Sequence, residues 1–143
     1  MAKTYSEFTS SIQSDWIDYN EHLNDAAYAA VLTRANEAFL EHVNLSQGYR
    51  EKTNCSMYTV EMLIGYQAEV HLSETLSAQT TVSELGAKKI RVETKLFRSD
   101  GVLAATGRVL YLHYDGNSEK VTPFSESQIS ILESFKSESD STI

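Results

Sequence analysis

The sequence predicts an α+β fold in which a curved antiparallel sheet of about five strands surrounds one long central helix. Three observations support this prediction. A segment near residues 24–43 has helical spacing and is rich in alanine at its start. From residue 57 to residue 114, apolar and polar side chains alternate as they do in strands. Residues 4–13 precede the helix and suit a first strand or an extended arm.

The predicted helix begins at Asn24 or Asp25, either of which can cap it, and ends near Val43. Alanines surround Tyr28, so the first two turns are nearly all apolar, and we expect them to be buried on most sides. The second half is expected to emerge towards water. Its polar residues are Arg34, Asn36, Glu37, Glu41 and His42. The apolar residues at helical spacing are Tyr28, Val31, Leu32, Ala35, Phe39 and Val43.

Strand patterns cover residues 57–66, 76–83, 90–97 and 103–111, with turn signals at 86–88 and 99–101. Gly107 marks a bend or a close approach of another segment. We expect a short helical or irregular piece at 46–55 and a docked helix at 125–135. A largely buried helix followed by a continuous meander is best accommodated by a sheet that curls around it, which is the hot-dog architecture. An open α+β sandwich with one exposed helix fits the alanine-rich turns less well.

The composition predicts a single domain over residues 1–143 and disfavours several classes of partner. The chain has 12 Lys and Arg against 20 Asp and Glu, a formal net charge of -8. This charge argues against binding to nucleic acid or to an anionic membrane surface. The one cysteine, Cys55, cannot form an internal disulfide, and no apolar run approaches the roughly 20 residues of a membrane span. We therefore expect a cytoplasmic protein.

Common enzyme motifs are missing from the sequence, which has neither a Gly-x-Ser-x-Gly elbow nor a phosphate-binding glycine loop. The four histidines lack the close spacing of zinc ligands, so we predict no metal site and no tightly held cofactor. The polar and aromatic segment at 15–28 is the strongest candidate site, because its polar groups lie where a nearly apolar helix begins. The helix N-terminus also offers unpaired N–H groups and the positive end of a dipole, which suit a developing oxyanion.

The run from Asp18 to Tyr28, DYNEHLNDAAY, resembles the signature of hot-dog thioesterases related to 4-hydroxybenzoyl-CoA thioesterase. The resemblance implies that the carboxylate of Asp18 attacks the thioester carbonyl or activates a water that does so. It also implies that the Asp25 N–H binds the thioester oxygen, while His22 and Asn24 orient the turn or assist the water. The candidate catalytic residues are Asp18, Asn20, His22, Asn24 and Asp25.

Within this family the sequence is most similar to betainyl-CoA thioesterases of carnitine breakdown, through residues 15–20, 40–45 and 56–61. It departs from the family pattern at Glu21, where glycine is usual. If that position requires a positive φ, a glutamate there costs on the order of 1 kcal/mol. The resemblance further implies a homodimer or a dimer of dimers with the active site at the subunit junction.

The expected substrate is an acyl-CoA whose acyl group carries a quaternary ammonium, which proteins hold against aromatic faces and sometimes near a carboxylate. The candidate residues for binding it are Trp16, Tyr19, Tyr28, Tyr58, Glu61 and Tyr66. The candidate cations for the CoA phosphates, placed around one predicted hairpin, are Lys88, Lys89, Arg91 and Arg98. Two alternatives stay open. One is a thioesterase for aryl or medium-chain acyl-CoA, and the other is a non-catalytic module that binds acyl-CoA or another small ligand.

Overall fold

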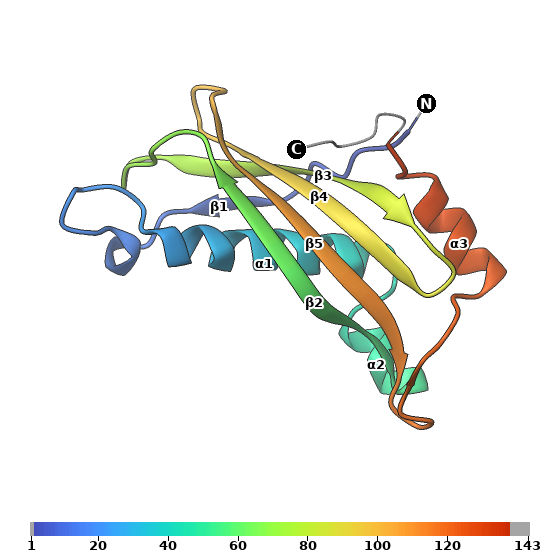
Figure 1. Cartoon of the computed structure of the whole chain (residues 1–143). Helices are drawn as coiled ribbons and strands as arrows, with labels where there is room; N and C mark the ends of the chain where they lie inside the picture. The colour runs from blue at the N-terminus through green and yellow to red at the C-terminus, as the bar shows by residue number, and fades with distance from the viewer. Residues whose placement is uncertain (1, 138–143) are drawn as a thin grey trace.

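The computed structural model describes residues 2–137 and consists of one antiparallel sheet curled around one long helix (Figure 1). The sheet order is β1-β3-β4-β5-β2, and the short β6 pairs with β5. The predicted fold class is therefore confirmed. The elements in chain order are β1 (Thr9–Ser11), a 3-10 turn (Ser14–Trp16), α1 (Asp25–His42), α2 (Gln47–Thr53), β2 (Cys55–Tyr66), β3 (Thr75–Leu85), β4 (Lys89–Phe97), β5 (Leu103–Asp115), β6 (Lys120–Val121) and α3 (Glu126–Glu133).

Helix α1 lies in the concave face of the sheet and buries one stripe along its whole length. The expectation that its first two turns are buried on most sides is wrong, because Ala26 is exposed and Ala29 and Ala30 are only half-buried. Asn36 was expected to face water but is also buried, and its side-chain oxygen accepts a 2.6 Å hydrogen bond from the Thr94 hydroxyl. The alanines therefore allow the helix to pack close to the sheet on one side, while its other sides remain partly exposed to solvent.

The close approach predicted at Gly107 is made by α1. A Cβ atom at this position would lie 2.8 Å from Cδ2 of Leu32, which is fully buried in the helix. Real Cβ atoms do not approach other carbons so closely, so a larger residue at position 107 would push α1 away from β5. The missing side chain of Gly107 thus sets the depth at which the helix sits in the sheet.

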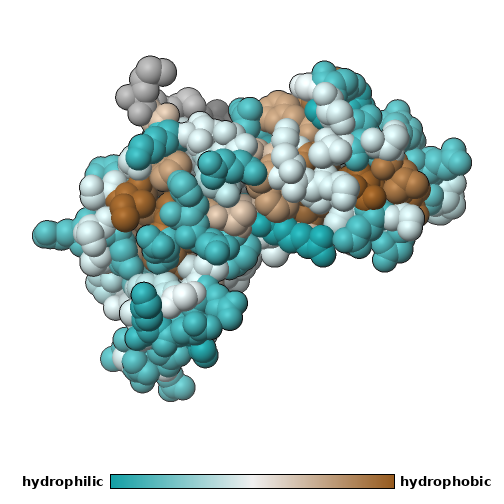
Figure 2. All heavy atoms as spheres, turned by 180° about the vertical axis from the view of Figure 1, so that it is seen from behind, coloured by the Kyte–Doolittle hydropathy of each residue, from teal (hydrophilic) through white to brown (hydrophobic). Residues whose placement is uncertain are grey.

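The core divides into two apolar clusters along α1. The first lies around the start of the helix and includes Val31, Leu76 and Leu96. The second lies around its end, where Phe39 contacts Phe135 with ring centroids 5.2 Å apart, beside the end of α3. From behind, polar side chains cover much of the surface and apolar ones reach it in separate patches (Figure 2). Among the described residues, no helix has the length and apolar character needed to cross a bilayer.

Strand β2 forms one edge of the sheet, and β5 is its only strand partner within residues 2–137. Such an edge presents backbone N–H and C=O groups that another chain can pair with. Several large apolar side chains of β2 are also about half exposed, although the neighbouring β5 is mostly buried. They are Tyr58, Val60, Leu63 and Tyr66. The combination of an open edge and exposed apolar side chains distinguishes β2 from the other strands.

Candidate active site

The segment that resembles the thioesterase signature forms a tight loop immediately before α1. Ile17 and Leu23 pair as an isolated antiparallel bridge, and between them the Asp18 N–H donates to the His22 carbonyl at 2.9 Å. The Glu21 N–H donates back to the Asp18 carbonyl, also at 2.9 Å. These bonds satisfy the backbone of the loop locally and fix the direction in which the Asp18 side chain leaves it.

Asn24 joins this loop to the helix. Its side-chain oxygen accepts a 2.8 Å hydrogen bond from the Ala27 N–H, as an N-cap does, while its side-chain nitrogen donates to the Trp16 carbonyl at 2.7 Å. The Asn24 backbone N–H donates to the same carbonyl at 2.8 Å. The first helical residue is Asp25, whose N–H has no acceptor inside the helix because of its position. Asn24 therefore fixes the position of the Asp18 loop relative to the Asp25 N–H at the start of the helix.

Asp18 is half-buried, and one oxygen of its carboxylate is hydrogen-bonded within its own loop. Its Oδ1 atom accepts a 2.8 Å hydrogen bond from the Asn20 N–H and a longer one, 3.4 Å, from the His22 N–H. Both bonds end on the same oxygen, which leaves Oδ2 without a partner among the described residues. One oxygen is thus held in place while the other is available to a ligand or a water.

An open surface hollow of about 350 Å³ lies beside this carboxylate. It is bounded by the loop, by the first turn of α1, and by the end of β2 with the connection that follows. The residues that line it are Asp18, His22, Leu23, Tyr28, Tyr66, Gln67, Ala68 and Glu69. Four of the sequence-predicted site residues, Asp18, His22, Tyr28 and Tyr66, are therefore brought together here.

Two tyrosines form the aromatic part of the hollow. The rings of Tyr28 and Tyr66 meet edge to face, with centroids 5.1 Å apart and planes at 89°. The Tyr28 hydroxyl donates to the Ala68 carbonyl at 3.0 Å, and burial, reinforced by Tyr66 and Glu69, raises the pKa of this hydroxyl above its ordinary value. The Tyr66 hydroxyl donates to the Asp25 carbonyl at 3.4 Å. Tyr28 therefore stays a neutral hydrogen-bond donor at physiological pH.

The other predicted substrate-binding residues lie outside this hollow within one subunit. Trp16 is half-buried beneath the Arg34 guanidinium, 5.1 Å from the ring centroid, and Tyr19 is 94% exposed at the tip of the loop. Tyr58 stacks on Tyr114 at 4.4 Å, and Glu61 binds Arg91 at 2.8 Å. Tyr58 and Glu61 belong to the earlier part of β2, whereas Tyr66 ends that strand.

The four predicted cations do not form one cluster. Lys88 and Lys89 are exposed at the start of β4, whereas Arg98 follows its end, about 30 Å away for an extended strand. Arg91 is paired with Glu61 and, at 3.5 Å, with Glu84.

Arg98 lies at the end of β4 that is nearer the hollow, where it donates to the Glu69 carbonyl at 3.1 Å. Its hydrogen bond to Asp100 lowers the pKa of that carboxyl to about 2, so the guanidinium already has an ionised partner.

Comparison with known proteins places the chain in a family. A sequence model described as the thioesterase-like superfamily matches residues 12–132, which is most of the chain. The chain belongs to the thioesterase-like superfamily. Thioester hydrolysis is the activity that this membership supports, and Asp18, Asn24 and the start of α1 all lie inside the matched region.

Curated relatives of this thioesterase-like chain include an L-carnitine dehydrogenase/betainyl-CoA thioesterase of Agrobacterium fabrum, 33% identical over 109 residues. The alignment covers 76% of this chain but 22% of that relative, so the chain spans about a fifth of the fused enzyme. The betainyl-CoA thioesterase of Pseudomonas aeruginosa is 24% identical over 125 residues, covering 87% of this chain and 79% of the relative.

Among solved structures, a Staphylococcus aureus protein in complex with CoA is similar in fold, with a TM-score of 0.86 and 22% sequence identity. The match covers 96% of this chain and 88% of that one.

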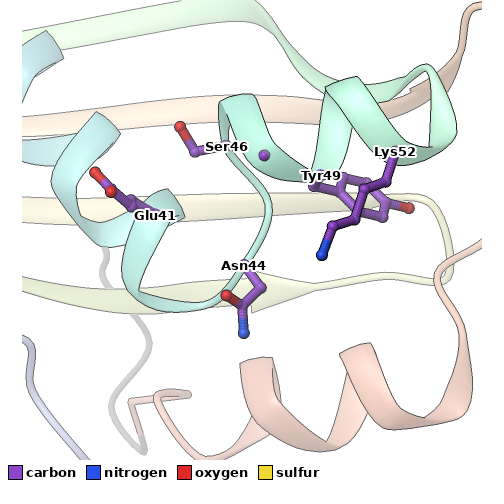
Figure 3. A pocket seen from close by; sticks show the side chains of 6 residues that line it. Glu41, Asn44, Ser46, Tyr49 and Lys52 are labelled. Atoms are coloured by element: carbon purple, nitrogen blue, oxygen red, sulfur yellow. The ribbon is translucent and has the colours of Figure 1, made fainter.

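A second hollow, of about 360 Å³, lies at the opposite end of the 18-residue α1, about 27 Å along its axis from the Asp18 loop (Figure 3). Its lining side chains come from the end of α1, the following turn and α2. They include Glu41, Asn44, Ser46, Tyr49 and Lys52. This hollow contains none of the residues predicted to take part in catalysis, and it is separated from the exposed helix N-terminus.

Sequence reasoning missed Glu69 and His71, which lie beside the predicted residue His22 at the border of the Asp18 hollow. Glu69 lies 3.2 Å from His22, measured from Oε2 to Nε2, and 3.9 Å from His71, measured from Oε1 to Nε2. The two histidine rings meet edge to face with centroids 4.9 Å apart. The spacing of histidines along the chain carries no signal for this cluster, because the loop and the β2–β3 connection meet only in the folded protein.

The unusual residue at position 21 supports a test of the loop geometry. Glu21 has a φ of 63°, so the position does require the left-handed region where glycine is favoured. We expect Glu21→Gly to relieve a strain of about 1 kcal/mol, offset in part by the greater entropy of glycine in the unfolded chain. Unfolding by urea should then give a free energy equal to or above that of the parent. Glu7→Gly, at an exposed position without positive φ, should lower it. A clear loss of stability in Glu21→Gly would contradict the proposed strain.

Proposed function

We propose that this chain hydrolyses an acyl-CoA thioester in the hollow beside Asp18. The observation that carries the proposal is the position of one half-buried carboxylate next to the N-terminus of α1. Asn24 holds these two groups at a constant separation through its bonds to Trp16 and Ala27. A carboxylate and a free backbone amide, here the Asp25 N–H, are the two groups that acyl transfer requires, one to attack or activate and one to stabilise the oxyanion.

The chemistry can follow either of two routes from this geometry. In the first, Oδ2 of Asp18 attacks the thioester carbon, the C–S bond breaks with loss of CoA thiolate, and water hydrolyses the resulting mixed anhydride. In the second, Asp18 takes a proton from a water that attacks the same carbon. In both routes the Asp25 N–H is expected to bind the carbonyl oxygen as negative charge develops, aided by the positive end of the helix dipole.

Replacement of Asp18 tests the catalytic role directly. The side-chain amide of the Asp18→Asn variant keeps an oxygen that can accept the Asn20 N–H, but it removes the nucleophile or base. We expect the kcat for thioester cleavage to fall by about 10²–10⁴-fold, since that is the range for loss of a general base. Released CoA is measured with a thiol reagent, and circular dichroism checks the fold. The matched variant Asp15→Asn, at an exposed position of the neighbouring 3-10 turn, should retain activity. Near-normal turnover by Asp18→Asn would overturn the assignment.

Betainyl-CoA is the substrate that we propose within this class. Both curated relatives described above carry betainyl-CoA thioesterase in their names, and the first is 33% identical to this chain. The hollow supplies two tyrosine rings, Tyr28 and Tyr66, and the carboxylate of Asp18 in the same lining. Aromatic faces and a nearby negative charge are what a quaternary ammonium requires for recognition.

An uncharged analogue separates recognition of charge from recognition of shape. In 3,3-dimethylbutanoyl-CoA, carbon replaces the nitrogen of betaine, so the acyl group has the same shape without the positive charge. We expect the parent protein to show a higher kcat/KM for betainyl-CoA than for this analogue. Tyr66→Leu should reduce that preference by roughly 2–30-fold, the range for a cation–π contact of about 0.5–2 kcal/mol. Equal rates for the two substrates, or a preference for aryl or medium-chain acyl-CoA across a wider panel, would reject betainyl-CoA.

The open edge of β2 supports a homodimer formed by pairing two copies of this strand. In one subunit Tyr58, Leu112 and Lys89 occupy one row across the sheet, and Tyr66, Ala105 and Leu96 occupy another. Antiparallel pairing of two β2 strands places the first row of one copy beside the second row of the other. The predicted residues Tyr58 and Lys89, which lie far from Asp18 in their own subunit, would then approach the hollow of the neighbouring subunit.

A charge placed on this edge tests the dimer. Leu63 is about half exposed on β2, and in this register it lies opposite Glu61 of the partner subunit, so an aspartate there would place two carboxylates across the pairing. We expect light scattering to give a dimer or tetramer for the parent chain and a smaller species for Leu63→Asp, with reduced thioesterase activity. Ile131→Asp, at a similarly exposed position of α3, should keep the parent mass. A parent chain that is monomeric at all concentrations would exclude the shared site.

A further inference from the structure

The rim of the Asp18 hollow carries a cluster of three potential metal ligands. His22 comes from the loop before α1, and Glu69 and His71 come from the connection between β2 and β3. One ligand atom from each residue lies within 4.8 Å of the others. Two imidazoles and one carboxylate are a ligand set that zinc and similar divalent metals favour, whereas magnesium and calcium favour oxygen ligands alone.

The spacing of the ligand atoms fits a small tetrahedral ion. Bonds of about 2.0–2.1 Å to a central zinc place neighbouring ligand atoms about 3.3 Å apart. The Nε2 atom of His22 lies 3.2 Å from Oε2 of Glu69, the Nε2 atom of His71 lies 3.9 Å from Oε1 of the same carboxylate, and one ligand atom from each of the three residues lies within 4.8 Å of the others. Small rotations of exposed side chains therefore suffice to complete the coordination, and a water can occupy the fourth position.

The backbone under the cluster is held firmly in place. The Leu23 N–H donates to the Val70 carbonyl at 2.7 Å, which joins the loop of His22 to the segment that holds the other two ligands. Val70 is fully buried, so its neighbours Glu69 and His71 both turn to the exposed side. Both backbone polar groups of Ala68 are hydrogen-bonded: its N–H donates to the Ala104 carbonyl, and its carbonyl accepts from the Tyr28 hydroxyl. The ligand positions thus exist before any ion arrives, which lowers the entropy cost of binding.

The local charge also favours a cation. Asp18 lines the same hollow as His22 and Glu69, so the region holds two carboxylates. The nearest guanidinium described there, that of Arg98, is paired with Asp100 at 2.5 Å. We propose that His22, Glu69 and His71 form a binding site for one divalent transition-metal ion, of the zinc type, at the entrance of the hollow. The ion would tie the Asp18 loop to the β2–β3 connection.

Binding of the metal itself is the decisive measurement and does not depend on any substrate. Untagged protein, treated with a chelator and then freed of it, is titrated calorimetrically with Zn²⁺, and Co²⁺ is added to a second sample to record its visible absorption. We expect saturable binding of one ion per subunit and a rise in the melting temperature with Zn²⁺. Bound Co²⁺ should show the strong visible absorption of a four-coordinate ion.

The variants His71→Ala and Glu69→Gln should each weaken Zn²⁺ binding by at least tenfold and lose the Co²⁺ absorption. The matched control Glu51→Gln, at an exposed position of α2, should bind as the parent does. Both ligand residues are exposed, so the substitutions leave the core intact, and melting without metal checks this. Unsaturable binding, or equal affinity in the parent and in His71→Ala, would mean that Zn²⁺ associates with surface carboxylates generally and would overturn the site. Failure of this test leaves the thioesterase proposal unaffected, because that proposal requires no metal.

Discussion

The packing of α1 into the concave face of the sheet is the constraint on which the rest of the structure depends. Leu32 occupies the space that a side chain at position 107 would fill, so at this point the helix contacts the backbone of β5 directly, while side chains of α1 and the strands pack together on either side. Close-packed interiors transmit such a placement rigidly. The N-terminus of the helix is thereby brought to the end of β2, and the loop that precedes it must cross the rim of the sheet.

The candidate site follows from where that loop is attached. Asn24 bonds the loop to the first turn of α1, and Leu23 bonds it to Val70 in the β2–β3 connection. Between these two attachments the backbone has little freedom, and Glu21 adopts a positive φ to close the turn. Asp18 consequently lines the same hollow as Tyr28 in the first turn of α1. A strained residue at such a position is a common feature of functional loops, since the surrounding bonds over-determine its conformation.

The open edge of the sheet determines how the remaining predicted residues could reach the site. A single subunit collects Asp18, His22, Tyr28 and Tyr66 around one hollow but leaves Tyr58 and Lys89 at the far end of the strands. In an antiparallel pair of β2 strands, the start of the strand in one subunit would lie beside the end of the strand in the other. Tyr58 and Lys89 of one subunit would then lie near the hollow of the other. The hollow is open to solvent, as a site completed by a neighbouring chain would be.

Local patterns in the sequence were sufficient to predict the elements that arise from nearest neighbours along the chain. The helix bounds follow from the Asn24 cap and the spacing of Tyr28, Val31 and Phe39, and strand alternation and turn residues indicate four of the strands. The motif around Asp18 was visible because its contacts join residues within one loop.

Contacts between distant segments were decided only by the tertiary structure. The burial of Asn36, the pairing of Arg91 with Glu61, and the meeting of His22 with Glu69 each join segments far apart in the sequence. A hydrophobic pattern that repeats every 3.6 residues in a helix, or every 2 in a strand, indicates which face of the element is apolar. It does not indicate which other element covers that face. The alanines of α1 illustrate the difference, since they permit close packing on any side and the curvature of one sheet decided which side was used.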